Sequence, residues 1–426
     1  MQDANSHLPI AIIGAGPIGL SAAVNLLAVG LEPTIFESGE LVGEHLARWG
    51  HVRMFSPWSY NVDPVAAEWL TPTGWQAPRA DAFPTGAELL ADYLQPLAAL
   101  PEIASRLHTA TRVTHVSRLQ HDVLRSNGRE EAPFVLRVSG PDGERDVLAR
   151  SVIDASGTFQ CPNGIGAHGI PALGELAAAE RIAYGVPDIT GKARDDYAGK
   201  TVLVVGGGHS AFNALQDLVS LAEQNPDTRI LWGVRSATLH NVIRSPKDDE
   251  LQERRALEVR IQQWLEDGRF EVVTNLAIEA IHPQGEQGAR LVVESGGQRL
   301  SAVDRIIAAT GFRPDLALLS ELRVSLDPAT QSPARLAPLI DPNQHSCGSV
   351  PEHGAAELTH AEPGLYILGI KSYGRAPTFL MRTGYRQVKS VVAALLDPDA
   401  VTPVPVCGAT RSTANQASRQ CEPSCG

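Results

Sequence analysis

The chain opens with a short apolar run, a glycine-rich turn and a longer apolar segment of helical period. Ile10–Ile13 is rich in β-branched residues, which is typical of a buried parallel strand. Apolar residues then recur at helical spacing over residues 18–29, and Gly30 provides a natural end for a helix. A second apolar run, residues 34–36, ends at Glu37. This pattern predicts a strand, a helix and a second strand.

Three glycines join the first predicted strand to the helix with the spacing G-x-G-x-x-G. Gly14 permits a tight turn, Gly16 lets a pyrophosphate approach the backbone, and Gly19 allows the helix to pack closely on the strand. The helix N-terminus supplies free N–H groups and partial positive charge for the phosphates. Glu37 follows about 20 residues on, where a carboxylate can accept a hydrogen bond from a ribose hydroxyl. The whole unit therefore predicts dinucleotide binding.

The same pattern of apolar run, glycine turn and helical segment occurs a second time. Thr201–Val205 is predicted as a strand and residues 212–221 as a helix. The turn between them has the form G-x-G-x-x-A, with Gly206 and Gly208 in the glycine places. A second dinucleotide-binding unit is expected here.

The second unit differs from the first at the end of its second strand. That strand, predicted over residues 229–234, is followed by Arg235 and not by an acid. An arginine at this place can pair with a 2′-phosphate, which favours NADPH over NADH. A solvated turn residue is the alternative interpretation of Arg235.

Two similar units in one chain form an internal repeat with a functional logic. One unit holds a redox cofactor permanently, and the other admits a mobile nicotinamide. The repeat predicts an α/β fold with two Rossmann-like dinucleotide-binding domains, in which the NAD(P)H domain is inserted into a discontinuous FAD domain. The predicted parts are the first FAD part at 1–165, a crossover linker at 166–199, the NAD(P)H domain at 200–304, the FAD return part at 305–400, and a disordered, cysteine-containing tail at 401–426.

The remaining segments carry weaker patterns. The stretch 41–60 is dense in aromatic residues and is interpreted as a loop that either lies near a flavin ring or covers the core. The substrate is expected at residues 49–60 and 345–360. Other predicted features are an irregular excursion over 64–84, a helix over 85–100 capped by Thr85, hairpin strands over 113–116 and 134–138, strands over 151–157 and 365–369, a crossover over 162–196, a return to the first domain from 305, and a helix over 377–396 whose N-terminal end faces the flavin.

Composition excludes several classes of protein. The chain has 426 residues, a formal net charge of −12 and 43% hydrophobic residues. The acidic balance argues against non-specific binding of nucleic acid, and no apolar run is long enough to span a bilayer. The polar start lacks the features of a secretory signal, and five cysteines are an odd number, so we expect a reducing cytoplasm and neither a membrane nor a metal site.

The motifs GAGPIG, GGGHSA and ATGFRP, in this order and with Glu37 in place, resemble the two-dinucleotide-domain FAD/NAD(P)-binding flavoprotein oxidoreductases. Within these the chain looks most like the flavin-containing monooxygenases, over about the first 400 residues. The resemblance implies FAD, NADPH rather than NADH, and hydride transfer to the flavin. The Gly-Asp pair that closes the FAD site in disulfide reductases is Gly369-Ile370 here.

The motifs together define a set of candidate cofactor-binding residues, whereas no catalytic residue is identified. The candidates are Gly14, Gly16, Pro17, Gly19, Glu37, Gly157, Gly206, Gly208, His209, Ser210, Arg235, Thr310 and Gly311.

What reoxidises the flavin decides the function, and three interpretations stay open. Oxygen, used to oxygenate a small molecule, needs a dry pocket and no protein nucleophile, and it is the acceptor we expect. A thiol, disulfide or metalloid acceptor would need a cysteine pair, for which Cys421 and Cys425, with Cys407 or Cys347, are the candidates, since Cys161 has no neighbour. A non-catalytic redox sensor is the third. A homodimer is compatible with all three.

Overall fold

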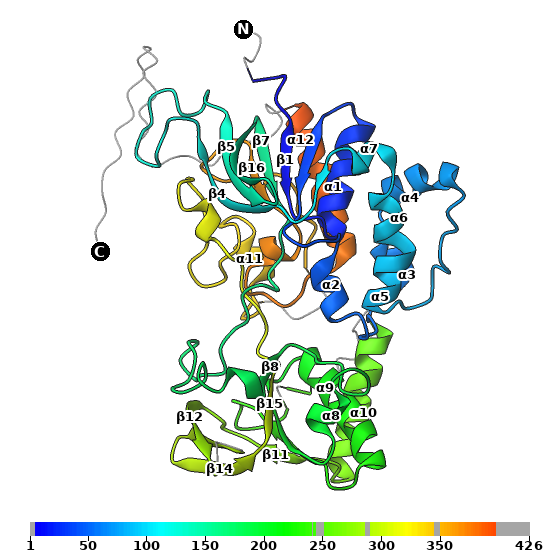
Figure 1. Cartoon of the computed structure of the whole chain (residues 1–426), viewed down its shortest axis with the longest axis vertical. Helices are drawn as coiled ribbons and strands as arrows, with labels where there is room; N and C mark the ends of the chain where they lie inside the picture. The colour runs from blue at the N-terminus through cyan, green and yellow to red at the C-terminus, as the bar shows by residue number, and fades with distance from the viewer. Residues whose placement is uncertain (1–4, 241, 244–250, 286–289, 345–349, 398–426) are drawn as a thin grey trace.

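A computed structural model describes residues 5–240, 242–243, 251–285, 290–344 and 350–397. Figure 1 shows two modules, one above the other, joined by two crossings of the chain. Each module is built on a five-stranded parallel sheet. The first sheet has the order β16 (Leu365–Ile367), β7 (Ser151–Asp154), β1 (Ile10–Ile13), β2 (Pro33–Phe36) and β3 (Leu107–His108).

The second sheet has the order β11 (Glu271–Val273), β10 (Arg229–Gly233), β9 (Thr201–Val205), β15 (Arg305–Ala308) and β8 (Ile182–Tyr184). The strands of the first sheet come from both sides of this unit in the chain, so the second module is inserted into the first. The predicted fold class is confirmed.

Both modules have three layers, because their central strands are apolar on both faces. In β1, Ile10 and Ile12 pack towards the helices α1 (Pro17–Ala28) and α12 (Met381–Leu396), whereas Ala11 and Ile13 pack towards a small antiparallel sheet. The second module repeats this arrangement with helices α9 (His209–Gln224) and α10 (Gln252–Glu266). The antiparallel sheets consist of β4 (Arg112–Arg118), β5 (Phe134–Gly140) and β6 (Gly143–Ala149), and of β12 (Ile278–Gln284), β13 (Arg290–Ser295) and β14 (Gln298–Val303).

Two segments at the crossings differ from the predictions. Residues 182–184, expected within a linker, form β8 and pair with β15. Strand β15, expected to start the return to the first domain, lies inside the second sheet between β9 and β8. The second sheet therefore extends beyond residues 200–304 on both sides, while the remaining domain limits stay predictions.

Two aromatic-rich or proline-rich segments contain more helix than the sequence indicated. The expected loop over 41–60 includes α2 (Glu44–Arg48) and the start of α3 (Trp58–Asn61), and the expected excursion over 64–84 begins with α4 (Pro64–Leu70), which packs on α1. Asp63 caps α4 by accepting a hydrogen bond from the backbone N–H of Val65. These helices are too short to show a hydrophobic period.

The helix predicted over 85–100 is present as several consecutive pieces, and the capping box between Thr85 and Glu88 is confirmed. Helix α12 begins at Met381, later than predicted. The pieces and the remaining short elements are η1 (Thr71–Thr73), α5 (Gly86–Leu89), η2 (Leu90–Leu94), α6 (Gln95–Ala98), α7 (Pro101–Ala104), η3 (Ala179–Arg181), α8 (Arg194–Tyr197), η5 (Ala317–Leu319), α11 (Ala337–Ile340) and η6 (Gly369–Tyr373).

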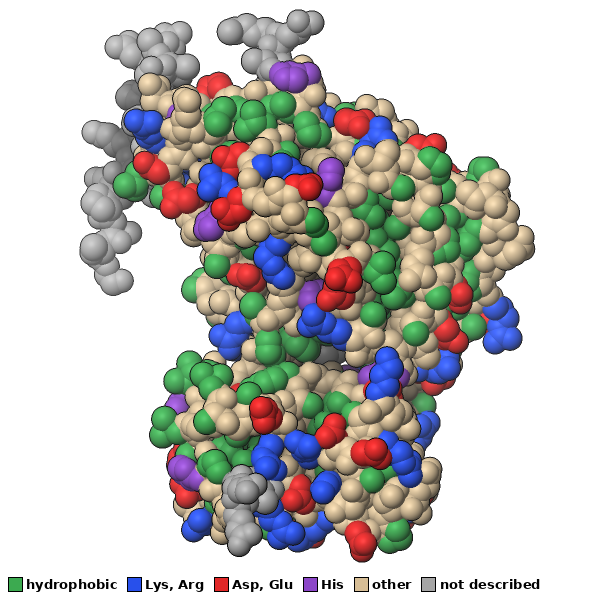
Figure 2. Space-filling model, viewed as in Figure 1, with side chains coloured by type: hydrophobic (Ala, Val, Ile, Leu, Met, Phe, Trp, Pro, Cys, Tyr) green, Lys and Arg blue, Asp and Glu red, His purple; other side chains and the backbone are tan. Residues whose placement is uncertain are grey.

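Acidic and basic side chains are interspersed over the face of both modules shown in Figure 2. Among the described helices, none combines the length and the apolar character needed to cross a bilayer. The predicted tail at 401–426 lies outside the described residues.

Candidate functional site

A cavity of about 800 Å³ is lined by residues of both modules. From the first module it is lined by the turn after β1, the start of α2, the segment after β7 and the start of α12. From the second module it is lined by the end of β8, the start of α9, the start of α10 and Phe312. The carboxyl ends of parallel strands meet here, which is where open α/β sheets bind ligands.

The first glycine turn has the geometry that its spacing predicts. Gly14 has φ +97°, and a Cβ there would lie 2.9 Å from the carbonyl oxygen of Ala155. A Cβ at Gly19 would lie only 1.9 Å from the carbonyl oxygen of Gly14, so helix and turn touch backbone to backbone. At Gly16, by contrast, no atom lies within 4 Å of such a Cβ. Gly14, Gly16 and Pro17 line the cavity, and Gly19 does not.

The carboxylate of Glu37 hydrogen-bonds the backbone of this turn. Its side chain is buried, and its two carboxylate oxygens accept hydrogen bonds from the backbone N–H groups of Ala15 and Gly39, both at 2.8 Å. Oε1 also accepts from the hydroxyl of Ser38 at 3.4 Å, whereas Oε2 keeps a further lone pair. Because Glu37 lines the cavity, it can still accept from a ribose hydroxyl. The carboxylate thus has a structural role that the motif alone does not show.

The second glycine turn is built in the same way. Gly206 has φ +139°, and a Cβ there would lie 2.3 Å from the carbonyl oxygen of Ala309, whereas Gly208 has open space around it. Helix α9 begins at His209, with Gly208 as an N-cap that makes no side-chain hydrogen bond. His209 and Ser210 line the same cavity as the first turn, although Gly206 and Gly208 do not.

Three other sequence candidates lie elsewhere or act indirectly. Arg235 is exposed at the end of β10 and is not among the cavity-lining residues. Thr310 donates from its hydroxyl to the carbonyl oxygen of Asn163 at 2.7 Å, and the carbonyl oxygen of Gly311 accepts from the backbone N–H of Asn163 at 2.9 Å. Both residues therefore hold the two chain crossings together. Gly157, with φ +74°, does line the cavity.

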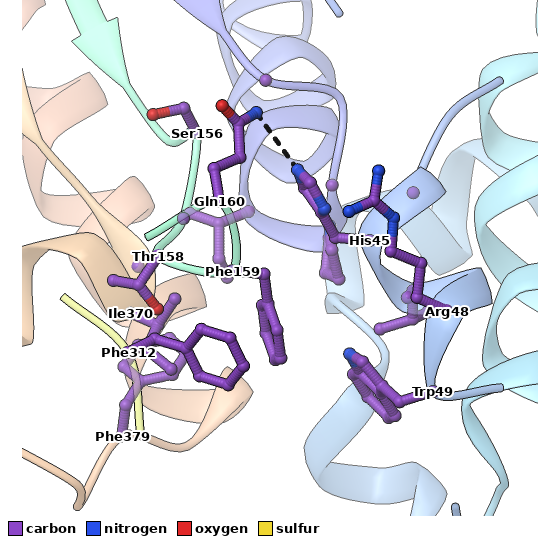
Figure 3. Close-up of a pocket in the computed structure, with 18 of the residues that line it drawn as sticks. His45, Arg48, Trp49, Ser156, Thr158, Phe159, Gln160, Phe312, Ile370 and Phe379 are labelled. Atoms are coloured by element: carbon purple, nitrogen blue, oxygen red, sulfur yellow. Dashed lines mark hydrogen bonds between the residues drawn. The ribbon is translucent and has the colours of Figure 1, made fainter. Parts of the chain in front are cut away.

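An aromatic wall crosses the cavity. Figure 3 shows Phe159 between Phe312 on one side and Trp49 on the other. The ring centroids of Phe159 lie 4.7 Å from Phe312, 6.0 Å from Trp49 and 6.4 Å from His45. Burial, followed by the Arg48 guanidinium, lowers the pKa of His45 and favours a neutral ring. Phe159 and Phe312 come from segments far apart in the chain, so no local pattern predicts that their rings meet.

The cavity fits a flavin dinucleotide. The open space at Gly16 is where a pyrophosphate can approach the backbone, and Glu37 stands where a ribose acceptor is needed. Two buried polar atoms of the cavity wall, His45 Nδ1 and Trp49 Nε1, have no hydrogen-bond partner among the described residues, so a polar ligand is expected beside them. Leu380 and Met381 at the N-terminal end of α12 also line the cavity.

The buried charged pair Asp154–Lys371 lies next to Ser156 of the cavity wall and was not predicted from the sequence. Lys371 Nζ lies 2.6 Å from Asp154 Oδ2 and 2.9 Å from Ser156 Oγ, and both charged side chains are fully buried. Ser156 lines the cavity and also donates to Asp154 Oδ1 at 2.7 Å. Lys371 follows the Gly369-Ile370 pair directly.

Cys161 is the one cysteine within the described residues; its thiol is free and does not line the cavity. Burial raises the pKa of its thiol. Cys347, Cys407, Cys421 and Cys425 lie outside the described residues. No cysteine pair therefore faces the cavity from the described segments.

Residues 11–334 match the model of the pyridine nucleotide-disulphide oxidoreductase family. A ferredoxin–NADP reductase of Salinispora tropica is 32% identical over 158 residues, which span 36% of this chain and 41% of that relative. Among solved structures, a bacillithiol disulfide reductase from Bacillus cereus covers 92% of this chain and 99% of its own, with a TM-score of 0.65 and 18% identity. A flavin monooxygenase from Stenotrophomonas maltophilia covers 91% and 98%, with a TM-score of 0.58 and 23% identity. These two structural likenesses show the fold alone.

Proposed function

The chain belongs to the pyridine nucleotide-disulphide oxidoreductase family, and we propose that it is a monooxygenase that takes a hydride from NADPH and passes the electrons to oxygen. It is an FAD-dependent oxidoreductase with FAD and NADPH as cofactors. The proposed reaction converts a small substrate, O₂, NADPH and a proton into the oxygenated product, water and NADP⁺.

The observation that carries the proposal is the shared cavity. The first glycine turn and the N-terminal residues of α9 line one space, so two dinucleotides held by them would meet inside it. Hydride transfer needs reacting atoms about 3–3.5 Å apart, which one shared space can provide. When bound, the flavin accepts a hydride and returns two electrons to an acceptor, and the protein supplies position and environment.

The wall of this cavity favours oxygen over a thiol. Trp49, Phe159, Phe312 and Phe379 present flat apolar surfaces to the cavity, and such surfaces offer water no hydrogen bonds beside the expected ring. No cysteine among the described residues lines the cavity, so the described segments supply no thiol beside the expected ring.

A second candidate function is electron transfer to a protein acceptor. It is favoured by the stretch of likeness to a ferredoxin–NADP reductase, which spans less than half of that protein. The thiol or metalloid alternative depends on tail cysteines outside the described residues.

The test is a single turnover with the purified, FAD-loaded protein. NADPH reduces the flavin without air, and oxygenated buffer made with isotopically labelled O₂ is then added together with a thioether or a primary amine as probe. We expect labelled oxygen in the probe and one O₂ consumed per NADPH. A variant truncated after Ala400 and the Cys161→Ser variant should behave alike. Turnover only with ferredoxin, or only with a disulfide and an intact tail, would refute the monooxygenase.

A further inference from the structure

A buried acid on a neighbouring helix holds the histidine of the second glycine turn. Glu258 of α10 is 5% exposed, and its Oε1 lies 2.8 Å from Nε2 of His209. The two helices α9 and α10 lie side by side in the lower module of Figure 1. The residues are 49 positions apart, and Glu258 belongs to no motif. A buried carboxylate is costly unless it is paired, and the hydrogen bond with His209 gives Glu258 a partner.

The ring of His209 is fixed on three sides. Phe212 of the same helix contacts it edge to face with centroids 5.5 Å apart, and Phe55 does so at 5.4 Å. Phe55 comes from the first module and packs against the core of the second. Glu258 holds Nε2, so Nδ1 is the remaining polar atom of the ring, and no described residue hydrogen-bonds it.

The position of this ring is where a nucleotide phosphate is expected. His209 is the first residue of α9, its side chain is 30% exposed, and it lines the cavity. Gly208 before it leaves open space, and helix N-termini attract phosphates. A histidine whose second nitrogen is held by a carboxylate has its ring orientation fixed.

We propose that Glu258 is a positioning residue that aims Nδ1 of His209 at the pyrophosphate of the nicotinamide dinucleotide. In the complex, Nε2 of His209 keeps its hydrogen bond with Oε1 of Glu258, and Nδ1–H donates to a phosphate oxygen. This inference rests on the proposed function. The pyrophosphate is common to NADPH and NADH, so the pair sets affinity for both and does not discriminate between them.

The test measures binding of NADP⁺ and NAD⁺ to the FAD-loaded protein by calorimetric titration. Glu258→Ala should weaken both nucleotides roughly tenfold, equally, with unchanged FAD content, because one charge-assisted hydrogen bond loses its geometry. Glu258→Gln can still accept from Nε2–H and should recover most of the affinity. At saturating NADPH, the rate of flavin reduction should stay within about twofold of wild type, so KM changes and kcat does not.

Two further variants test whether Glu258 acts on nucleotide binding through His209. His209→Ala should weaken binding as much as Glu258→Ala does, and the double variant should add nothing, because Glu258 acts through His209. Glu266→Ala removes an exposed acid of the same helix and should leave binding unchanged. Additive losses, or wild-type affinity in Glu258→Ala, would overturn the inference. A wild-type protein that binds neither nucleotide would instead refute the proposed function.

Discussion

Removing one partner of the Asp154–Lys371 pair should strongly destabilise the first module. Lys371→Met keeps an unbranched side chain of similar length but leaves the carboxylate of Asp154 without its cation. Both side chains are fully buried, and the 2.6 Å contact between Nζ and Oδ2 joins residues 217 positions apart. The pair therefore connects the end of β7 to the segment after β16, next to Ser156 of the cavity wall.

The expected magnitude follows from the burial of both charges. Leaving one member of a buried pair unpaired costs about 3–5 kcal/mol, whereas replacing both by uncharged groups of similar volume is often close to neutral. Lys371→Met and Asp154→Asn should each cost about 3–5 kcal/mol, and the double variant less than either. At about 2–4 °C per kcal/mol for a domain of this size, each single variant should lower Tm by roughly 6–20 °C.

The assay is thermal and urea unfolding of the apoprotein, which separates the pair from flavin binding. Lys389→Met is the matched control, because Lys389 is an exposed lysine of α12, and its loss should change stability by less than about 0.5 kcal/mol. Wild-type stability in Lys371→Met would refute the reasoning. Equal and additive losses in the double variant would show that the two charges act independently.

Three further predictions concern single residues. Gly16→Val should fold, because its Cβ meets no atom within 4 Å, but should lose FAD, and a normal flavin content would contradict the assignment of the turn. Arg235→Ala should weaken NADPH use about ten- to a hundredfold and spare NADH, since a charge-assisted contact contributes about 1.5–3 kcal/mol; equal losses would exclude Arg235 as the discriminator. Burial, then Asp188, raises the pKa of Asp217 to about 6, so the folded state binds more protons and stability falls as pH rises towards 6. At about pH 7 and above, Asp217→Asn should therefore raise Tm, with a gain in the free energy of unfolding of at most about 3 kcal/mol. Near pH 4 the gain should almost vanish, and a gain independent of pH would contradict this explanation.

The parts of the molecule that the sequence predicted are those fixed by local spacing. Gly14, Gly16 and Gly19 lie within one turn, and the contacts that require glycine there are made by the same turn or by the strand beside it. Strand β8 was missed because it has only three residues in a segment rich in glycine and proline, and it forms because β15 offers it an edge. Such pairing depends on a distant segment, so no local pattern records it.

The same limit applies to the site. Glu37 was predicted because it ends a strand of its own unit. Glu258 and Lys371 were not, because each pairs with a residue that lies 49 or 217 positions away in the chain. Two interpretations were open for the aromatic stretch 41–60, and its residues divide between them. Trp49 and Phe55 line the cavity, Trp58 is buried in the core, and the helical turns of the stretch were not predicted. Phe159 was not predicted at all, because its partners Trp49 and Phe312 are brought together only by the fold.

The two glycine turns differ in how they are held, and the difference matches the roles proposed for them. The first turn is closed by Glu37, a buried carboxylate of the same unit that bonds two backbone N–H groups, so its shape does not depend on the second module. Such a rigid turn suits a cofactor that stays bound. The second turn carries His209, which is held by Glu258 on one side and touched by Phe55 of the first module on the other. Because His209 contacts residues of both modules, the environment of the second turn depends on how the two modules pack together, whereas the first turn is held by its own unit.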